Sequence, residues 1–230
     1  MSRRLSLQWT CLFFLTLATA PASAQDVAKY REFSLGSSMA SVVELTGSRA
    51  TDVRTLHEKP FLLQELLWRP RYSTGRTLPD VDPVREVIFS FSGDRLYRIT
   101  VYYDRTRTAG LTHDDLVLAL TDIYGAPAAA TTHTERRDRF EPSEAATLIA
   151  FWERGDMMVS LYWSDSRAGY GLRVMSQTGE SEARLTMAEA VALDAREAPA
   201  REAARLKQDA DDLKAADERA RETNKGAFRP

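Results

Sequence analysis

Two short segments of the chain carry apolar residues at helical spacing between a capping residue and a glycine. In the first, a serine cap is followed by Gly47 as the left-handed residue that ends the helix, and the residues at helical spacing between them are Met39, Val42, Val43 and Thr46. In the second, Thr112 takes the capping position and the helical pattern stops at Gly125. Each predicted helix has about three turns or fewer, so both must pack on a larger element to be stable.

That larger element is predicted to be β-sheet, because a series of strand-like segments follows each helix. The turn 92–95, Ser-Gly-Asp-Arg, separates two alternating segments and predicts a hairpin, and the turn 153–156 carries the same Gly-Asp pair. For the segment beginning after Pro60, a short helix is an alternative. The predicted strands are 52–57, 61–68, 85–91, 96–103, 128–134, 147–152, 157–163 and 170–176.

The order of one helix followed by strands therefore occurs twice, which indicates an internal duplication. The predicted fold class is α+β, with two repeats of one short helix plus about four antiparallel strands and a long charged C-terminal helical tail. We expect each helix to cover its own antiparallel sheet and to leave the other sheet face exposed. The stretches 69–83 and 135–143 are rich in prolines or charges and are predicted to be surface loops.

The tail changes composition to alanine and charged residues from Ser181 to Lys225. We predict two helices, with Pro199 in the first turn of the second, supported by oppositely charged residues four positions apart. Leu206 and Leu213 are seven residues apart, but the core positions between them lack the large apolar residues that a coiled coil needs. An exposed or partly disordered helix and a partner-binding or dimerising helix are both compatible with this pattern.

The segment 35–47, Leu-Gly-Ser-Ser-Met-x-x-Val-x-x-Leu-Thr-Gly, resembles the start of the small BamE/SmpA outer-membrane-assembly lipoproteins. The tandem arrangement is similar to that of the β-lactamase inhibitory proteins, in which two helix-plus-sheet repeats form a concave face. This resemblance implies a fold for the globular part of the chain. It carries over no functional residue, since the chain lacks the lipid-anchoring cysteine of the first family and the disulfides of the second.

The N-terminus has the pattern of an export signal. Arg3 and Arg4 precede an apolar run over 5–20, and the small residues 22–24 provide a cleavage site after Ala24. The run is too short for a membrane span. We therefore expect a periplasmic or secreted protein. The predicted organisation is a signal peptide at 1–24, a first helix-plus-sheet repeat at 25–108, a second at 109–178 and a charged helical tail at 179–230.

Composition excludes several classes of function. The only cysteine, Cys11, lies in the predicted signal peptide, so neither disulfides nor thiol chemistry are expected in the exported protein. The formal net charge of −2 gives no reason to expect a nucleic-acid partner. We predict no cofactor and no metal site, and no stable membrane span after cleavage.

Candidate catalytic residues are few. His113 is explained by the start of the second helix, whereas His57 and His133 lie at comparable distances beyond the two helix-ending glycines. Duplication would place these two on equivalent strands, where a metal or an acid–base pair is conceivable, but no ligand spacing accompanies them. No short hydrolase, phosphate-loop or dinucleotide motif is present.

The aromatic residues fall mostly on predicted strands, and alternation sends them to opposite faces of the sheet. Rings displayed to solvent would serve as interface anchors, and we select Trp68, Tyr103, Trp152 and Trp163 as the candidate binding residues; ordinary cross-strand packing is the alternative. The resulting hypothesis is a non-enzymatic protein-binding or scaffold protein of the bacterial-type cell envelope, with a protein partner. The alternatives are an envelope hydrolase without a short motif and an aromatic-face binder of glycans or small ligands.

Overall fold

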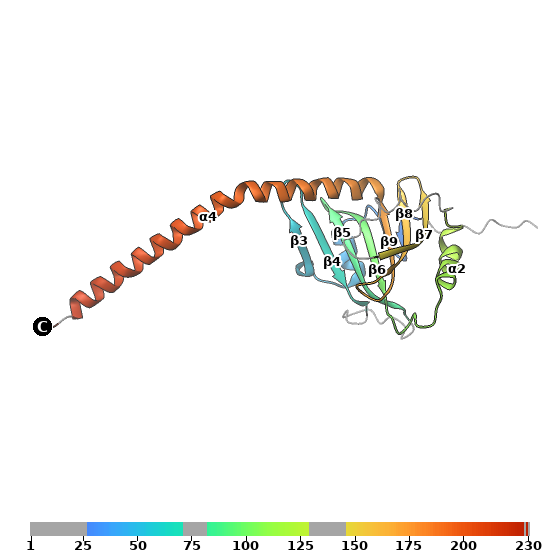
Figure 1. Ribbon diagram of the computed structural model, residues 1–230, viewed down its shortest axis with the longest axis horizontal. Helices are drawn as coiled ribbons and strands as arrows, with labels where there is room; N and C mark the ends of the chain where they lie inside the picture. Colours follow the sequence, from blue (N-terminus) through green and yellow to red (C-terminus); the bar gives the residue numbers. More distant parts are fainter. Residues whose placement is uncertain (1–26, 71–81, 129–145, 228, 230) are drawn as a thin grey trace, which may run out of the picture.

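The computed structural model describes residues 27–70, 82–128, 146–227 and 229 of the chain. Its centre is a seven-stranded sheet in which neighbouring strands are antiparallel, in the order β3-β4-β5-β6-β9-β8-β7 (Figure 1). The strands are β3 (Val53–His57), β4 (Leu63–Trp68), β5 (Val84–Ser92), β6 (Arg95–Tyr103), β7 (Ala146–Arg154), β8 (Met157–Ser164) and β9 (Gly169–Ser176).

The structure confirms an α+β fold with antiparallel strands and a long C-terminal helix. It does not contain a separate sheet for each helix, because β6 pairs with β9 and joins the strands of both halves into one sheet. Val101 lies opposite Leu172 in this pair, and both side chains are fully buried. Joining the halves removes two exposed strand edges, which two separate sheets would have left unpaired.

Two helices pack on one face of the sheet. Helix α1 (Met39–Thr46) begins at Ser38 and ends at Gly47, whose φ is +66°. Helix α2 (His113–Tyr124) begins with a capping box at Thr112 and ends at Gly125. The predicted ends of both helices are therefore confirmed. Buried side chains of both helices join the same apolar core as the sheet.

Two small elements were not predicted from the sequence. Strands β1 (Lys29–Tyr30) and β2 (Phe33–Ser34) form a separate two-stranded sheet, and the 3-10 helix η1 (Ala50–Asp52) leads into β3. Phe33 is fully buried, with its ring centroid 4.6 Å from that of Phe89 on β5. The N-terminal hairpin thus extends the core beside α1.

The opposite face of the sheet is also largely covered. Ser90, Ser160 and Tyr162 alternate with the core residues of β5 and β8, yet they are 0 %, 1 % and 1 % exposed. Gly171 on β9 makes room for the Tyr162 ring, since a Cβ there would lie 2.3 Å from it. The expectation of a broad exposed aromatic face is therefore wrong for this part of the sheet.

The tail is one helix, α4 (Gln177–Ala227), and not the two that Pro199 predicted. Proline removes one backbone hydrogen bond and crowds the preceding turn. Arg201 spans this position by donating to the Asp194 carbonyl at 3.1 Å and to Glu197 at 3.0 Å. Figure 1 shows α4 following the sheet past β3 and then leaving it in a different direction, as expected of a proline kink.

Within the described residues, none of the helices combines the length and the apolar character needed to cross a bilayer. The predicted signal peptide 1–24, including Ala24, lies outside these residues, as does most of the predicted strand 128–134.

Candidate functional site

Two of the four selected aromatic residues lie in the core. Trp68 is 2 % exposed, and its ring meets Phe33 edge-on at 5.6 Å between centroids. Trp152 is equally buried, and its indole nitrogen donates to the Gly125 carbonyl at 2.7 Å, which ties the end of α2 to β7. Trp68 packs on the N-terminal hairpin and Trp152 on the end of α2, so neither can act as an exposed anchor.

The other two are half-buried and differ in their surroundings. Tyr103 packs against the apolar core, where burial raises the pKa of its hydroxyl well above the ordinary value. Trp163, near the end of β8, lines a pocket of about 650 Å³. Of the four selected residues, Trp163 is the one that this pocket includes.

This aromatic pocket lies where the β6–α2 connection meets β7, β8 and the start of β9. Its wall is formed by Arg105, Thr108, Ala109, Gly110, Leu111, His113, Thr147, Trp163, Ala168 and Tyr170.

The sheet register brings the aromatic rings of the pocket together. Trp163 lies directly opposite Tyr170, with ring centroids 5.0 Å apart and planes at 84°. His113, the first residue of α2, meets Tyr170 edge-on at 5.7 Å. The Tyr170 hydroxyl donates to the Leu111 carbonyl at 3.2 Å and so ties the connection to the sheet. These contacts hold one wall of the pocket in place.

Electrostatics at the pocket favour a neutral tyrosine beside a cation. Burial, and then the nearby Asp115 carboxylate, raise the pKa of Tyr170, so its hydroxyl stays protonated and keeps donating. Asp115 itself accepts hydrogen bonds from Thr112 in the capping box. Arg105 lines the pocket and forms no ion pair with any described residue. The pocket therefore presents a cation without an ion-pair partner among the described residues next to three aromatic rings, with the Asp115 carboxylate near Tyr170.

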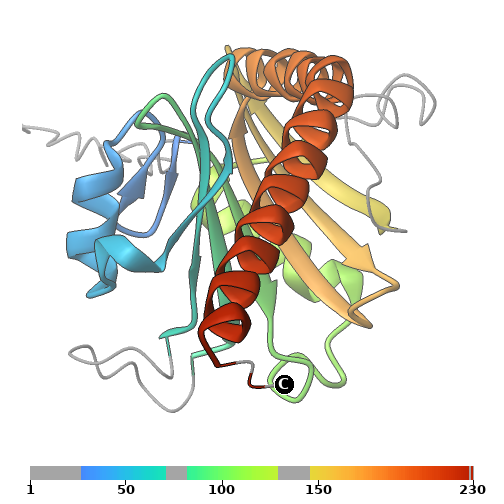
Figure 2. The ribbon, with the colours of Figure 1, turned by 90° about the vertical axis from the view of Figure 1, so that its left-hand side faces the viewer.

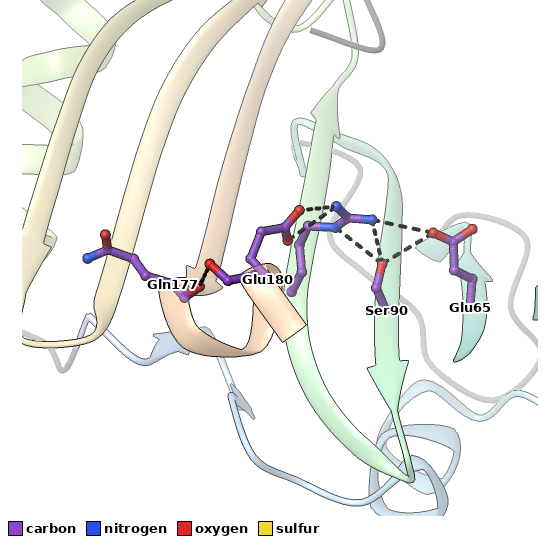
Figure 3. Close-up of polar contacts among 6 residues, drawn as sticks. Glu65, Ser90, Gln177 and Glu180 are labelled. Atoms are coloured by element: carbon purple, nitrogen blue, oxygen red, sulfur yellow. Dashed lines mark hydrogen bonds and ion pairs between the residues drawn. The ribbon is translucent and has the colours of Figure 1, made fainter. Parts of the chain in front are cut away.

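A second feature is the base of α4, residues 177–193, which lies on the face of the sheet opposite to α1 and α2. Arg98 on β6 donates to Glu180 at 2.9 Å and to Ser90 at 3.2 Å, and its guanidinium lies 3.6 Å from Glu65 (Figure 3). Glu180 is 6 % exposed. Small residues allow close approach, since a Cβ on Gly179 would lie 2.8 Å from Tyr97.

The start of α4 is held by the β7–β8 turn. Asp156 accepts hydrogen bonds from the Thr178 backbone at 2.8 Å and from the Ser176 hydroxyl at 2.5 Å. Burial alone would raise the pKa of Asp156, but hydrogen bonds from Ser176 and Thr178 oppose it and leave the pKa below its ordinary value. The base is thus fixed at its N-terminus and along the sheet.

The remainder of the helix, residues 194–227, is exposed at every position, and we call it the arm. Figure 2 shows α4 from the end at which the arm projects. His57 on β3 lies 4.0 Å from Asp194, where the helix leaves the sheet. Leu206 and Leu213 on the arm are 56 % and 69 % exposed.

The histidines do not form a site in the described part of the chain. His57 lies beside the start of the arm, His113 lines the aromatic pocket, and His133 lies outside the described residues. No group of three histidine, cysteine, aspartate or glutamate side chains that could hold a metal occurs among the residues described. Comparison with known proteins finds no matching family model, no matching curated protein and no matching solved structure.

Proposed function

We propose that this chain is an exported, non-enzymatic protein-binding or scaffold protein of the bacterial-type cell envelope, and that the arm 194–227 is its partner-binding segment. The observation that carries this proposal is the contrast within one helix. The base of α4 is tied to the sheet, whereas every residue of the arm is exposed to solvent.

Beyond the approach of Asp194 to His57, the arm depends on its own side chains for stability. The arm has ion pairs between Glu197 and Arg201 at 3.0 Å and between Glu202 and Arg205 at 2.7 Å. Each such pair contributes only about 0.2 to 0.5 kcal/mol, whereas helices in folded proteins are stabilised mainly by tertiary packing of one face. A partner that packs along the arm would supply the missing tertiary contacts.

Leu206 and Leu213 give the arm its partner-facing side. They are seven residues apart and therefore lie on one face of the helix, where both are exposed. An apolar pair surrounded by charged residues suits an amphipathic helix or a groove of another protein. Because the base is fixed to the sheet, a partner bound there would be held in a set direction from the body.

We also propose that the body arose by duplication of a helix-plus-strands unit of the BamE/SmpA type. Each half contributes consecutive antiparallel strands in chain order, β3 to β6 in the first half and β7 to β9 in the second. The last strands of the two halves, β6 and β9, meet at the centre of the sheet.

Site-specific photo-crosslinking in the envelope of the producing cell tests the proposal. A photoreactive residue at Leu213 is expected to yield a discrete adduct with another protein, and the same residue at Leu118, an exposed position on α2, is expected not to. Leu206→Glu, which keeps the helix but adds charge to the same face, should abolish the adduct. Equal adducts at both positions, or an adduct that survives Leu206→Glu, would contradict the proposal.

A further inference from the structure

We infer that the aromatic pocket binds a saccharide ring that carries a carboxylate. This inference concerns a ligand of the body and is independent of the arm. It starts from the combination that the pocket presents: three aromatic rings, hydroxyl and backbone groups, and one arginine, around a volume of about 650 Å³.

The volume and the rings fit a sugar. A pocket of about 300 to 1,000 Å³ accommodates a small organic ligand, and one of this size accepts one or two sugar rings. Trp163 is half-buried, so part of its ring packs on Tyr170 while the remainder lines the pocket. Aromatic side chains offer large apolar surfaces beside polar tips, which suits the apolar C–H face of a sugar.

The remaining wall can recognise hydroxyl groups. Thr147 on β7 contributes a side chain with both donor and acceptor capacity, and His113 contributes ring nitrogens. Ala109, Gly110 and Leu111 line the same space, and Gly110 can contribute only backbone groups. A purely aromatic ligand would use the rings but would leave these polar groups without hydrogen bonds, at a cost in affinity.

Arg105 indicates that the ligand carries a negative charge. Its neighbour Asp104 is occupied within the connection, where it accepts from the backbone of Thr106 at 2.9 Å, and Asp115 is held in the capping box of α2. Arg105 is therefore the charged group of the pocket without an ion-pair partner among the residues described. A guanidinium binds a carboxylate with paired hydrogen bonds, so the geometry selects an acidic sugar over a neutral one.

Two sugars that differ in one acidic group provide the probe: N-acetylmuramic acid carries a carboxylate on a lactyl ether, and N-acetylglucosamine lacks it. Titration of the full chain, followed by calorimetry and by Trp163 fluorescence, is expected to show saturable binding of the acidic sugar about tenfold tighter than of the neutral one. Benzoate, which has the carboxylate and a planar ring but no hydroxyl groups, is expected to bind more weakly than the acidic sugar.

Two arginine variants test whether the acidic sugar is bound by Arg105 itself or is attracted by the positive charge of the whole connection. Arg105→Gln should abolish the preference for the acidic sugar, whereas Arg107→Gln, an exposed arginine of the same connection outside the pocket wall, should retain it. Trp163→Phe should remove the fluorescence change and should weaken the binding seen by calorimetry. Equal binding of the two sugars, equal effects of the two arginine variants, tighter binding of benzoate, or no binding at millimolar concentration would each overturn the inference.

Discussion

At the residue scale, the turn aspartates link strands to helices. Asp94 and Asp156 each follow the glycine of a two-residue turn, and each accepts from a helix N-terminus, the Met39 nitrogen at 2.9 Å and the Thr178 nitrogen at 2.8 Å. The sequence indicates the turns, because glycine followed by aspartate is a local signal. It does not indicate the second role of the aspartates, since the hydrogen-bonded partner of Asp94 is 55 residues away.

Replacing Asp156 by alanine is expected to destabilise the fold by about 1 kcal/mol at pH 7, because it leaves the first turn of α4 without its acceptor. The pKa of Asp156 is below its ordinary value of 3.8, although burial opposes this shift, since hydrogen bonds from Ser176 and Thr178 favour the charged form. Its contribution is therefore present above that pH and is lost as the pH falls through the native pKa. Urea unfolding of both proteins at pH 7 and pH 3 measures this difference.

Asp122→Ala, at an exposed position on α2, is the control and should change the free energy of unfolding by less than about 0.5 kcal/mol. The difference between the original protein and Asp156→Ala should be smaller at pH 3 than at pH 7. If it is equal at the two pH values, the carboxylate does not act through its charge.

At the element scale, local signals predicted what lies close in sequence. The caps at Ser38 and Thr112 and the glycines after both helices fixed the helix ends, and alternation identified the β5–β6 hairpin. The pairing of β6 with β9 could not be predicted, because no turn connects them and the pattern of each strand also suits an edge. The prediction that Pro199 separates two helices was wrong for a similar reason. Arg201 bonds across the proline position, but in the sequence it is only one member of a common pair of opposite charges four residues apart.

The sequence predicts the aromatic pocket only in part, because the pocket depends on contacts between residues that are distant in the chain. Trp163 was selected from the sequence as an aromatic residue on a strand, and Tyr170 belongs to the same pattern. His113 was explained by its place at a helix start, and Arg105 carried no local signal. Their meeting depends on the β8–β9 register and on the path of the β6–α2 connection, which are set by tertiary packing.

The contribution of the contact between α4 and the sheet to the stability of the fold can also be tested. Glu180→Ala removes the carboxylate nearest to the Arg98 guanidinium, which keeps its contacts with Ser90 and Glu65. We expect a loss of about 2 kcal/mol in the free energy of unfolding, because a half-buried guanidinium loses the nearer of its two carboxylates. Amide hydrogen exchange should rise at the base of α4. Glu182→Ala, an exposed neighbour on the same turn, should leave both measurements unchanged; similar effects of the two changes would contradict this account.

At the scale of the whole molecule, one sheet carries apolar helices on one face and a charged helix on the other. The core lies between the sheet, α1, α2 and the N-terminal hairpin, and its buried side chains come from both halves of the chain. The base of α4 belongs to this body, since Ala183 and Ala190 are buried on the sheet. The arm does not, because all its residues are exposed.

Two truncations of α4 should therefore differ sharply in their effect on the stability of the body. Deletion of 196–230 removes nearly the whole arm but no buried side chain of the described structure, so the free energy of unfolding of the body should change by less than about 0.5 kcal/mol. Deletion of 178–230 also removes Glu180, Ala183 and Ala190 and uncovers the sheet, so it should destabilise the body by several kcal/mol, on the order expected for a buried ion pair and lost apolar packing. Urea unfolding followed by near-ultraviolet circular dichroism of the buried tryptophans measures the body in both cases. Equal destabilisation by the two deletions would show that the arm folds back on the body in solution, and it would then not be the free partner-binding segment that we propose.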